Sequence, residues 1–244
     1  MPKVIAYMPL MYGAEYLEAS IKSMHDFVDK IIIVYTDRPS QGNATIEVCP
    51  EDELMLREIA ENASNKVKWY KSRFRNEGEH RSYIYKLAKG YDLRFTLDAD
   101  EIAEPKDVEH ALKLSYETDK RYIGIGGFIN FWRSFNWACH DGFTPIRIIN
   151  LKNPEGTQGV VPLRIYHFST AQSETIIRYK WNVSGHAQEL RPGWIDDILY
   201  KWSPENNFHD LHPVAHGIWN ATPFDKNLLP DILKQHPNFN KEMI

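Results

Sequence analysis

The stretch "RFTLDADEIAEP", residues 94–105, joins an apolar segment directly to a group of acids. Its first residues are typical of a buried strand, and three carboxylates follow within four positions, at Asp98, Asp100 and Glu101. Like charges at this spacing repel one another, and a buried carboxylate is costly unless a positive charge lies beside it. The stretch therefore predicts a strand end that holds a cation, and a metal ion would supply the missing charge.

Strand-like and helix-like segments alternate through the first half of the chain. The strand-like segments are residues 3–10, 30–36, 66–72 and 92–100, and the helix-like segments are 14–28, 51–64 and 78–90. This order predicts an α/β fold with a doubly wound, mostly parallel sheet and right-handed crossovers. Ligands of such sheets bind beyond the carboxyl ends of the strands, so Asp98 and Asp100 lie where a site is expected.

The second half of the chain follows a different pattern. After a helix-like segment at 105–119, strand-like segments at 122–135, 145–152 and 162–169 have no regular helix between them. From Thr170 onward the sequence is typical of loops and short helices. Because no repeat or linker separates the halves, we expect a single domain over residues 1–244, with an irregular second half.

Composition argues against several classes of protein. The formal net charge of −4 and the pI near 6.2 disfavour a nucleic-acid partner, which would require a basic surface. Two cysteines, Cys49 and Cys139, are too few for a secreted disulfide scaffold. The first residues lack the features of a signal peptide, and no window approaches the roughly 20 apolar residues of a membrane span. We therefore expect a cytoplasmic protein without a transmembrane segment.

Asp98 and Asp100 form the clearest chemical motif. Two positions apart in an extended segment, their side chains would point to the same side and could share one ion. Carboxylate oxygens suit Mg²⁺ or Mn²⁺, typically with substrate phosphates completing the coordination shell. The alternative is a polar turn before a helix, in which Glu101 and Glu104 interact with the helix dipole.

This order of elements, with D-x-D after the fourth strand, resembles the GT-A fold of nucleotide-sugar glycosyltransferases. It is similar to family 2 enzymes over about residues 3–135. The segments "EHRSYIYKLAKGYDLRFTLDADEIAEP" and "YHFS" also resemble family 17, whose D-x-D stretch runs "DxDEIP" after a helix containing Gln-Arg. Here the helix carries His80-Arg81, and Ala103-Glu104 intervene before the proline.

The resemblance implies a donor site in residues 1–135 and an acceptor side in residues 136–244. Asp98 and Asp100 would hold Mn²⁺ or Mg²⁺ against the diphosphate of a UDP-sugar, and Asp37 would lie near the nucleoside. A turn-forming role is the alternative for Asp37. The expected nucleotide-sugar-binding residues are Pro9, Met11, Asp37, Arg75, Arg81, Asp98, Ala99 and Asp100.

Basic and imidazole side chains are expected to complete this site. Arginine forks suit phosphate, so Arg75 and Arg81 are candidates, with solvated charges on a helix face as the alternative. The resemblance also implies a metal ligand from the second half, frequently a histidine. His167 follows a strand-like segment, which is a rigid position for a ligand, and His186 is the second candidate. A hydrogen-bonded structural histidine is the alternative for either.

The acceptor side would supply a general base if transfer inverts the sugar. The candidate carboxylates are Asp141, Glu189, Asp196 and Asp197. "GWIDDILYKW" resembles an acidic step before a late helix in family 2, although Asp196 and Asp197 also suit a helix N-terminus. Six of the seven tryptophans lie in the second half, and "GFINFWRSFNW" is the segment expected to line an acceptor cleft. Core packing is the alternative.

The sequence as a whole favours a metal-dependent glycosyltransferase that moves a sugar, expected to be a hexose, from UDP to a hydroxyl. The acceptor is open between carbohydrate, lipid and protein, and a homo-oligomer is compatible with this interpretation. A sugar nucleotidyltransferase is the first alternative, but "PLMYGAEYLEAS" has one glycine and no basic residue where such enzymes carry a Gly-rich basic loop. An inactive carbohydrate-binding protein is the second, and the intact Asp98–Asp100 pair argues against it.

Overall fold

Four strands of the first half lie side by side in one sheet and run in the same direction. Their order is β3-β2-β1-β4, as the computed structural model shows. The structure describes residues 2–38, 48–140, 142–184, 186–206 and 209–244. The bounds of these strands are Val4–Leu10 for β1, Lys30–Tyr35 for β2, Val67–Lys71 for β3 and Leu93–Thr96 for β4.

The sheet continues into the second half of the chain with mixed strand directions. β8 pairs antiparallel with β4 and β6, while β9 runs parallel to β6 and pairs antiparallel with the short β5. Two short strands, β7 and β10, extend the β6 edge. The bounds are β5 Glu101–Ala103, β6 Tyr122–Trp132, β7 Trp137–Cys139, β8 Ile146–Asn150, β9 Gln158–Thr170 and β10 Thr222–Pro223. The longest strands share the direction of β1, so the expected mostly parallel α/β sheet is confirmed.

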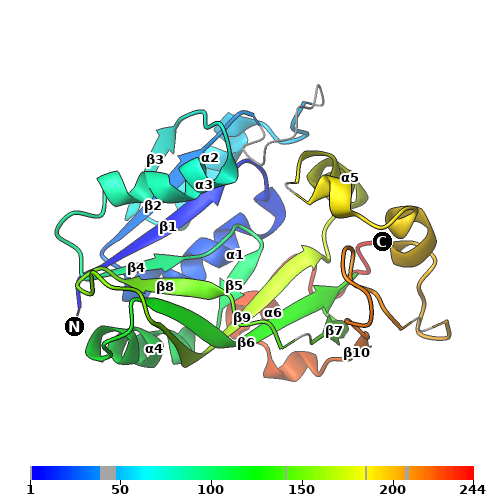
Figure 1. Cartoon of the computed structure of the whole chain (residues 1–244). Helices are drawn as coiled ribbons and strands as arrows, with labels where there is room; N and C mark the ends of the chain where they lie inside the picture. Colours follow the sequence, from blue (N-terminus) through cyan, green and yellow to red (C-terminus); the bar gives the residue numbers. More distant parts are fainter. Residues whose placement is uncertain (1, 39–47, 141, 185, 207–208) are drawn as a thin grey trace.

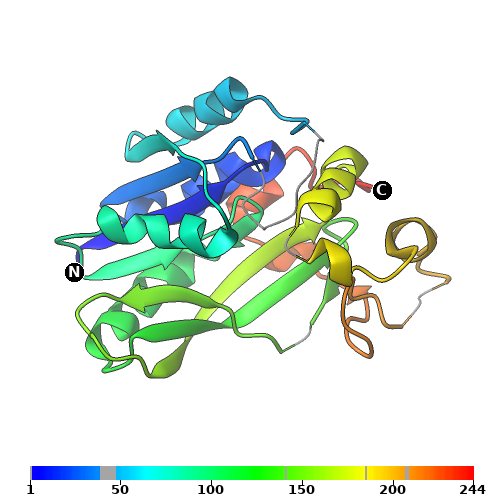
Figure 2. The ribbon, with the colours of Figure 1, turned by 45° about the horizontal axis from the view of Figure 1, so that its top comes forward.

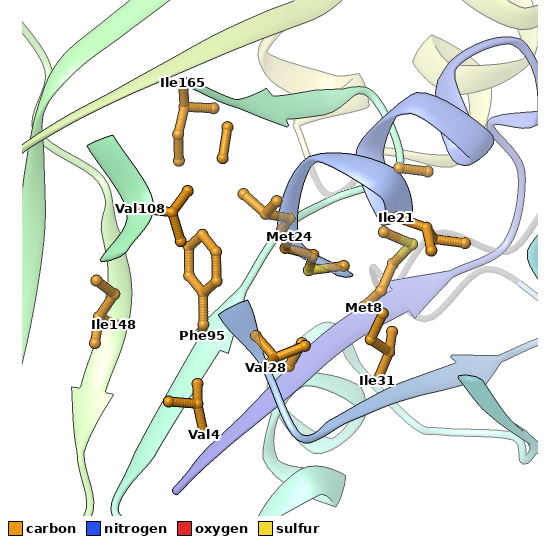
Figure 3. Packing of buried hydrophobic residues seen from close by; sticks show 14 of the residues in the cluster. Val4, Met8, Ile21, Met24, Val28, Ile31, Phe95, Val108, Ile148 and Ile165 are labelled. Atoms are coloured by element: carbon orange, nitrogen blue, oxygen red, sulfur yellow. The ribbon is translucent and has the colours of Figure 1, made fainter. Parts of the chain in front are cut away.

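Helices cover both faces of this sheet (Figure 1). Alternate residues of β1 point to opposite faces. Met8 packs in the cluster that contains α1 and α4, while Tyr7 packs in the cluster beside the segment after α3. Figure 3 shows the larger cluster, with Ile21, Phe95 and Val108 converging between helices and sheet. The bounds are α1 Ala14–Met24, α2 Glu53–Ala63, α3 Glu77–Ser82 and α4 Pro105–Glu117.

Two elements end earlier than the sequence pattern indicates. The helix expected over residues 78–90 ends at Ser82 and continues as a 3₁₀ turn over Tyr83–Lys86. Aromatic and β-branched residues in "YIY" have a lower helical preference, which favours this tightening. The fourth strand ends at Thr96, so Asp98 and Asp100 lie in a turn and not in an extended segment.

The irregular second half contains one helix of substantial length, α5, over Glu174–Val183. α5 lies beyond the ends toward which β1 and β9 point, in both orientations of the molecule (Figures 1 and 2). A six-residue π-helical segment, Trp194–Leu199, and the short α6, Asp231–Lys234, follow. None of the helices in the described part of the chain has both the length and the apolar character needed to cross a bilayer.

Candidate active site at the strand ends

The turn after β4 presents the carboxylates. The Glu101 N–H donates a hydrogen bond of 3.0 Å to the Asp98 carbonyl, which closes the turn. Ser20 Oγ donates to the same carbonyl, and the Phe168 N–H donates to the Asp100 carbonyl at 2.9 Å. α1 and β9 therefore fix the backbone of the turn from opposite sides.

Gly13 lets the loop between β1 and α1 pass close to this turn. Its φ of +127° lies in a region that L-residues with a side chain rarely adopt, and an added Cβ would lie 2.6 Å from Ala99 Cβ. The Glu51 carboxylate accepts hydrogen bonds from the Gly13 and Ala14 N–H groups, at 2.6 and 3.1 Å. The first backbone donors of α1 are thus bound to an acid from within the chain.

Protein side chains supply the positive charge that the three carboxylates require. Arg81 donates to both oxygens of Asp98 at 3.3 Å, and Arg147 from β8 forms a two-pronged pair with Glu101. Lys180 from α5 lies 2.9 Å from Asp100 Oδ2. The sequence led us to expect a metal ion as the source of this charge, with Arg81 as a candidate near Asp98. It does not reveal that Arg147 and Lys180 reach the same turn.

These contacts set the protonation of the two aspartates. Burial by itself would raise the pKa of Asp98, but the charges of Arg81 and Arg147 outweigh burial and hold that pKa well below its usual range. Burial likewise opposes ionisation of Asp100, and the charge of Lys180 lowers its pKa. Both carboxylates are therefore ionised at neutral pH.

His167 lies directly beside Asp100. Strand register places His167 opposite Glu101 of β5 and Asn130 of β6. Its Nδ1 is 2.8 Å from Asn130 Oδ1, and its Nε2 is 3.8 Å from Asp100 Oδ2. Burial lowers the pKa of His167, so the ring is neutral. Since an amide oxygen only accepts, Nδ1 carries the proton and the lone pair of Nε2 faces Asp100.

A pocket of about 510 Å³ opens above this turn, a size typical of small-ligand sites. Its walls contain many of the residues expected from the sequence, and it also receives residues that sequence reasoning missed. The expected residues on its walls are Pro9, Met11, Arg81, Asp98, Ala99, Asp100, His167 and His186. Polar residues among those missed include Arg147, Ser169, Gln172 and Lys180. No local signal marks the missed set, because each residue is an ordinary strand, loop or helix position until the chain folds.

Asp37 and Arg75 do not line this pocket among the described residues. Asp37 follows β2, as expected, and Arg73 donates to both of its oxygens at 2.6 and 2.7 Å. The hydrogen bonds from Arg73 lower the pKa of Asp37 to about 2. Arg75 is exposed on the segment before α3, where its backbone N–H contacts Glu79.

The acceptor-side carboxylates occupy different places. Asp196 pairs with Arg178 at 2.7 Å and Asp197 with Lys201 at 2.6 Å, and both acids are more than half exposed. Neither lines the pocket in the described chain. Their position at the start of the segment Trp194–Leu199 matches the alternative interpretation, residues at a helix N-terminus. Asp141 lies outside the described residues.

Glu189 is an acceptor-side carboxylate that does reach the pocket wall. Its Oε2 lies 2.8 Å from His186 Nδ1, and both side chains are more than half exposed. His186 is therefore paired with an acid at the pocket rim, whereas His167 is buried beside Asp100.

Most tryptophans of the second half pack in the core. Trp132 and Trp194 are fully buried, and they form one cluster with Trp202. The expectation that "GFINFWRSFNW" lines the cleft is correct for Phe128 and Asn130 and wrong for Trp132, which is fully buried. Simple alternation would place all three on one face, but the pairing of β6 with β9 shifts register between Asn130 and Trp132. Trp181 and Trp219 line the pocket with small exposed edges.

The donor set fits a divalent cation that arrives with a phosphate. Asp100 Oδ2 and His167 Nε2 converge, and no third His, Cys, Asp or Glu completes a cluster with them among the described residues. Mg²⁺ and Mn²⁺ commonly bind one or two carboxylates together with substrate phosphates. In the same wall, Gln172 Oε1 is buried without a hydrogen-bond partner in the described chain. This oxygen can accept a hydrogen bond from a ligand in the pocket.

Several solved structures are similar to this chain. S. aureus TarS is 14% identical, with a TM-score of 0.46 over 68% of this chain and 60% of that one. The structure of TarS in complex with UDP is 18% identical in sequence, with a TM-score of 0.38 over 53% of this chain and 36% of that one. A third structure is glucosyl-3-phosphoglycerate synthase from Mycobacterium tuberculosis in complex with Mn²⁺, UDP and phosphoglyceric acid. It is 13% identical in sequence, with a TM-score of 0.36 over 54% of this chain and 44% of that one.

The chain thus spans 60% of the first of these structures and less than half of the other two. No protein-family model and no curated protein matches it. At these identities and TM-scores the similarity establishes neither a family nor an activity. What the chain has in common with the expected fold is the α/β architecture itself, with a pocket at the carboxyl ends of its parallel strands.

Proposed function

We propose that this protein is a glycosyltransferase of GT-A type that uses a nucleoside diphosphate sugar, with a UDP-hexose as the expected donor. The observation that carries the proposal is the arrangement of Asp98, Asp100 and His167 in one pocket with Arg81 and Lys180. Carboxylates, imidazole and basic forks at the carboxyl ends of parallel strands are suited to a phosphorylated ligand.

The proposal includes a divalent cation, Mn²⁺ or Mg²⁺, held by Asp100 and His167 with Asp98 nearby. When bound, such an ion acts as a Lewis acid that stabilises the charge on a leaving diphosphate. Arg81 is placed to orient the diphosphate, because its guanidinium already reaches the pocket side of Asp98. Pro9 and Met11 would support the base, since both line the pocket at the carboxyl end of β1.

Asp37 and Arg75 belong to the proposed nucleoside end of the site. Asp37 is preorganised by Arg73 and can still accept hydrogen bonds from ribose hydroxyls, since an ionised carboxylate has about four lone-pair sites. We retain residues 1–135 as the donor half and 136–244 as the acceptor half of one domain, in a cytoplasmic protein.

For the acceptor hydroxyl, we propose Glu189 as the general base, supported by its place on the pocket wall and its contact with His186. Asp196 and Asp197 remain weaker candidates, because Arg178 and Lys201 hold them outside the pocket. The acceptor itself is a carbohydrate, lipid or protein hydroxyl. A base of this kind implies inversion at the anomeric carbon.

The structure disfavours a sugar nucleotidyltransferase. Such an enzyme would bind phosphates at the loop between β1 and α1. Here the backbone donors of Gly13 and Ala14 are already bound to Glu51, and a carboxylate at that position repels a phosphate.

A donor-hydrolysis screen tests the proposal. The purified protein is incubated with a panel of nucleotide sugars and Mn²⁺, and release of the nucleoside diphosphate is measured beside Asp100→Asn. We expect release from at least one UDP-sugar and its loss in the variant. Calorimetric titration with UDP, with and without Mn²⁺, checks binding independently. Absence of both hydrolysis and nucleotide binding would reject the proposal, and binding without a metal requirement would favour a carbohydrate-binding protein.

A further inference from the structure

We propose that Lys180 occupies the cation position on Asp100 in the nucleotide-free protein and gives it up when a divalent ion and a diphosphate bind together. This inference rests on the proposed function, since it concerns the same metal and donor. It assigns to Lys180 a role in keeping the metal site closed until the donor is present.

The contacts of one carboxylate oxygen carry the argument. Lys180 Nζ lies 2.9 Å from Asp100 Oδ2, and Gln172 Nε2 lies 3.1 Å from the same atom. Two donors therefore use the two lone pairs of that oxygen. His167 Nε2 faces Oδ2 as well, at 3.8 Å, which is too long for a hydrogen bond. A metal ion bridging His167 and Oδ2 must displace one of the two donors.

Charge determines which donor leaves. A divalent cation on Oδ2 would stand within a few ångströms of the Lys180 ammonium in a mostly buried site. Like charges a few ångströms apart repel strongly where little water screens them, and a doubled charge repels more. The neutral amide of Gln172 suffers no such repulsion. The ammonium and the metal therefore exclude one another.

The released ammonium has an evident new partner. Lys180 also contacts Ser169 Oγ at 2.8 Å, and both residues line the pocket. The start of α5 is held in place, because the Ser173 N–H donates to Glu15 at 3.0 and 3.2 Å. A side-chain movement is thus sufficient to turn Lys180 from Asp100 to a diphosphate. A phosphate that receives the ammonium makes metal binding easier, and by linkage the metal makes nucleotide binding easier to the same degree.

Mn²⁺ affinity, measured by electron paramagnetic resonance of the free ion, tests this inference without any assay of activity. The titrations compare the wild type, Lys180→Met and Lys180→Arg, each with and without saturating UDP. Lys201→Met is the matched control, because it removes the same charge from an exposed side chain that does not line the pocket in the described chain. Thermal melts establish that each variant is folded.

We expect Lys180→Met to bind Mn²⁺ about 10-fold more tightly than the wild type when UDP is absent, since the competing charge is gone. We expect UDP to improve Mn²⁺ affinity strongly in the wild type and Lys180→Arg, and much less in Lys180→Met. Lys201→Met should match the wild type.

Equal or weaker Mn²⁺ binding by Lys180→Met, with UDP-dependent binding intact in the wild type, would overturn the role of Lys180 and leave the proposed function standing. If neither the wild type nor Lys180→Met binds Mn²⁺, with or without UDP, the metal site is rejected and the present inference with it.

Discussion

At the scale of single residues, the Arg147–Glu101 pair connects the two halves of the chain under the site. Glu101 is fully buried, and Arg147 reaches it from β8 with a two-pronged contact while also lying 3.7 Å from Asp98. Glu101 in turn accepts a hydrogen bond from the Asp98 N–H at 3.2 Å. The orientation of Asp98 therefore depends on a residue 46 positions away from Glu101.

Arg147→Met is expected to destabilise the protein by about 3–5 kcal/mol, because it leaves the Glu101 charge buried without a partner. Urea denaturation measures the change. The double variant Glu101→Gln with Arg147→Met should recover part of the loss. Arg57→Met, which breaks an exposed pair with Glu61, serves as control and should cost less than about 1 kcal/mol. If Arg147→Met and Arg57→Met lower the free energy of unfolding by the same small amount, the buried pair is not important for stability.

The two histidine candidates are expected to differ in their effect on the metal. His167→Ala should weaken Mn²⁺ affinity by about 10-fold or more in the presence of UDP, because it removes an imidazole that faces Asp100. His186→Ala should change it less, since His186 is exposed and paired with Glu189. Isothermal titration with Mn²⁺ at fixed UDP compares the two. A larger loss for His186→Ala would reverse this ranking.

Residue types and spacing point to the acids of the turn and to Arg81, but not to Arg147 or Lys180. Asp98 and Asp100 follow an apolar strand, which is a local signal. Arg147 and Lys180 reach the turn only through tertiary contacts from β8 and α5. A buried acid shows that a positive charge is required, but its position in the sequence does not identify the source.

At the scale of elements, the loop between β1 and α1 constrains the carboxylate turn. Gly13→Ala should cost about 1–3 kcal/mol in backbone strain, and its new Cβ would in addition contact Ala99 at 2.6 Å. We expect lower stability in urea together with weaker UDP binding. Gly90→Ala is the matched control: its φ is also positive, at +86°, but nothing lies within 4 Å of the added Cβ.

Gly90→Ala should therefore lose stability without losing UDP affinity. If Gly13→Ala binds UDP as the wild type does, the close approach to Ala99 does not shape the site.

Alternating apolar segments allowed the strands and helices of the first half to be predicted, because periods of two and of about 3.6 residues are local properties. The early end of α3 and the turn at Asp98 could not be predicted in this way. The tightening after α3 follows the lower helical preference of "YIY", and the turn at Asp98 is held by contacts from Ser20 and Phe168. The helix α5 lies in a segment where loops and short helices were expected, but its bounds were not predicted.

At the scale of the whole molecule, stability is expected to fall as the pH drops below about 6.5. Burial lowers the pKa of His80 and His236 from 6.5, so both stay neutral in the folded protein while the unfolded chain takes up protons. Wherever the unfolded state binds more protons, the free energy of unfolding decreases as the pH is lowered, by up to about 1.4 kcal/mol per pH unit for each histidine. Asp37, with its pKa lowered to about 2, contributes a loss only below about pH 4.

Urea denaturation at pH 7.5, 6.5 and 5.5, conditions chosen at about one-unit steps around the histidine range, measures this slope. His236→Gln should make it shallower, because one proton uptake is removed. A free energy of unfolding that stays constant over this range would show that the two rings are protonated equally in both states.

The pairing of Asp100 with Lys180 has a consequence for biosynthesis. Asp100 precedes Lys180 by 80 residues in the sequence. Because synthesis proceeds at about 5–20 residues per second, Lys180 is added several seconds after Asp100. During that interval the nascent chain carries its acids at a strand tip without the ammonium that later neutralises Asp100. Until α5 emerges, Arg81 and Arg147 can pair with Asp98 and Glu101, while Asp100 lacks its partner ammonium. The nascent chain cannot complete its pocket before Lys180 and the rest of α5 have been made.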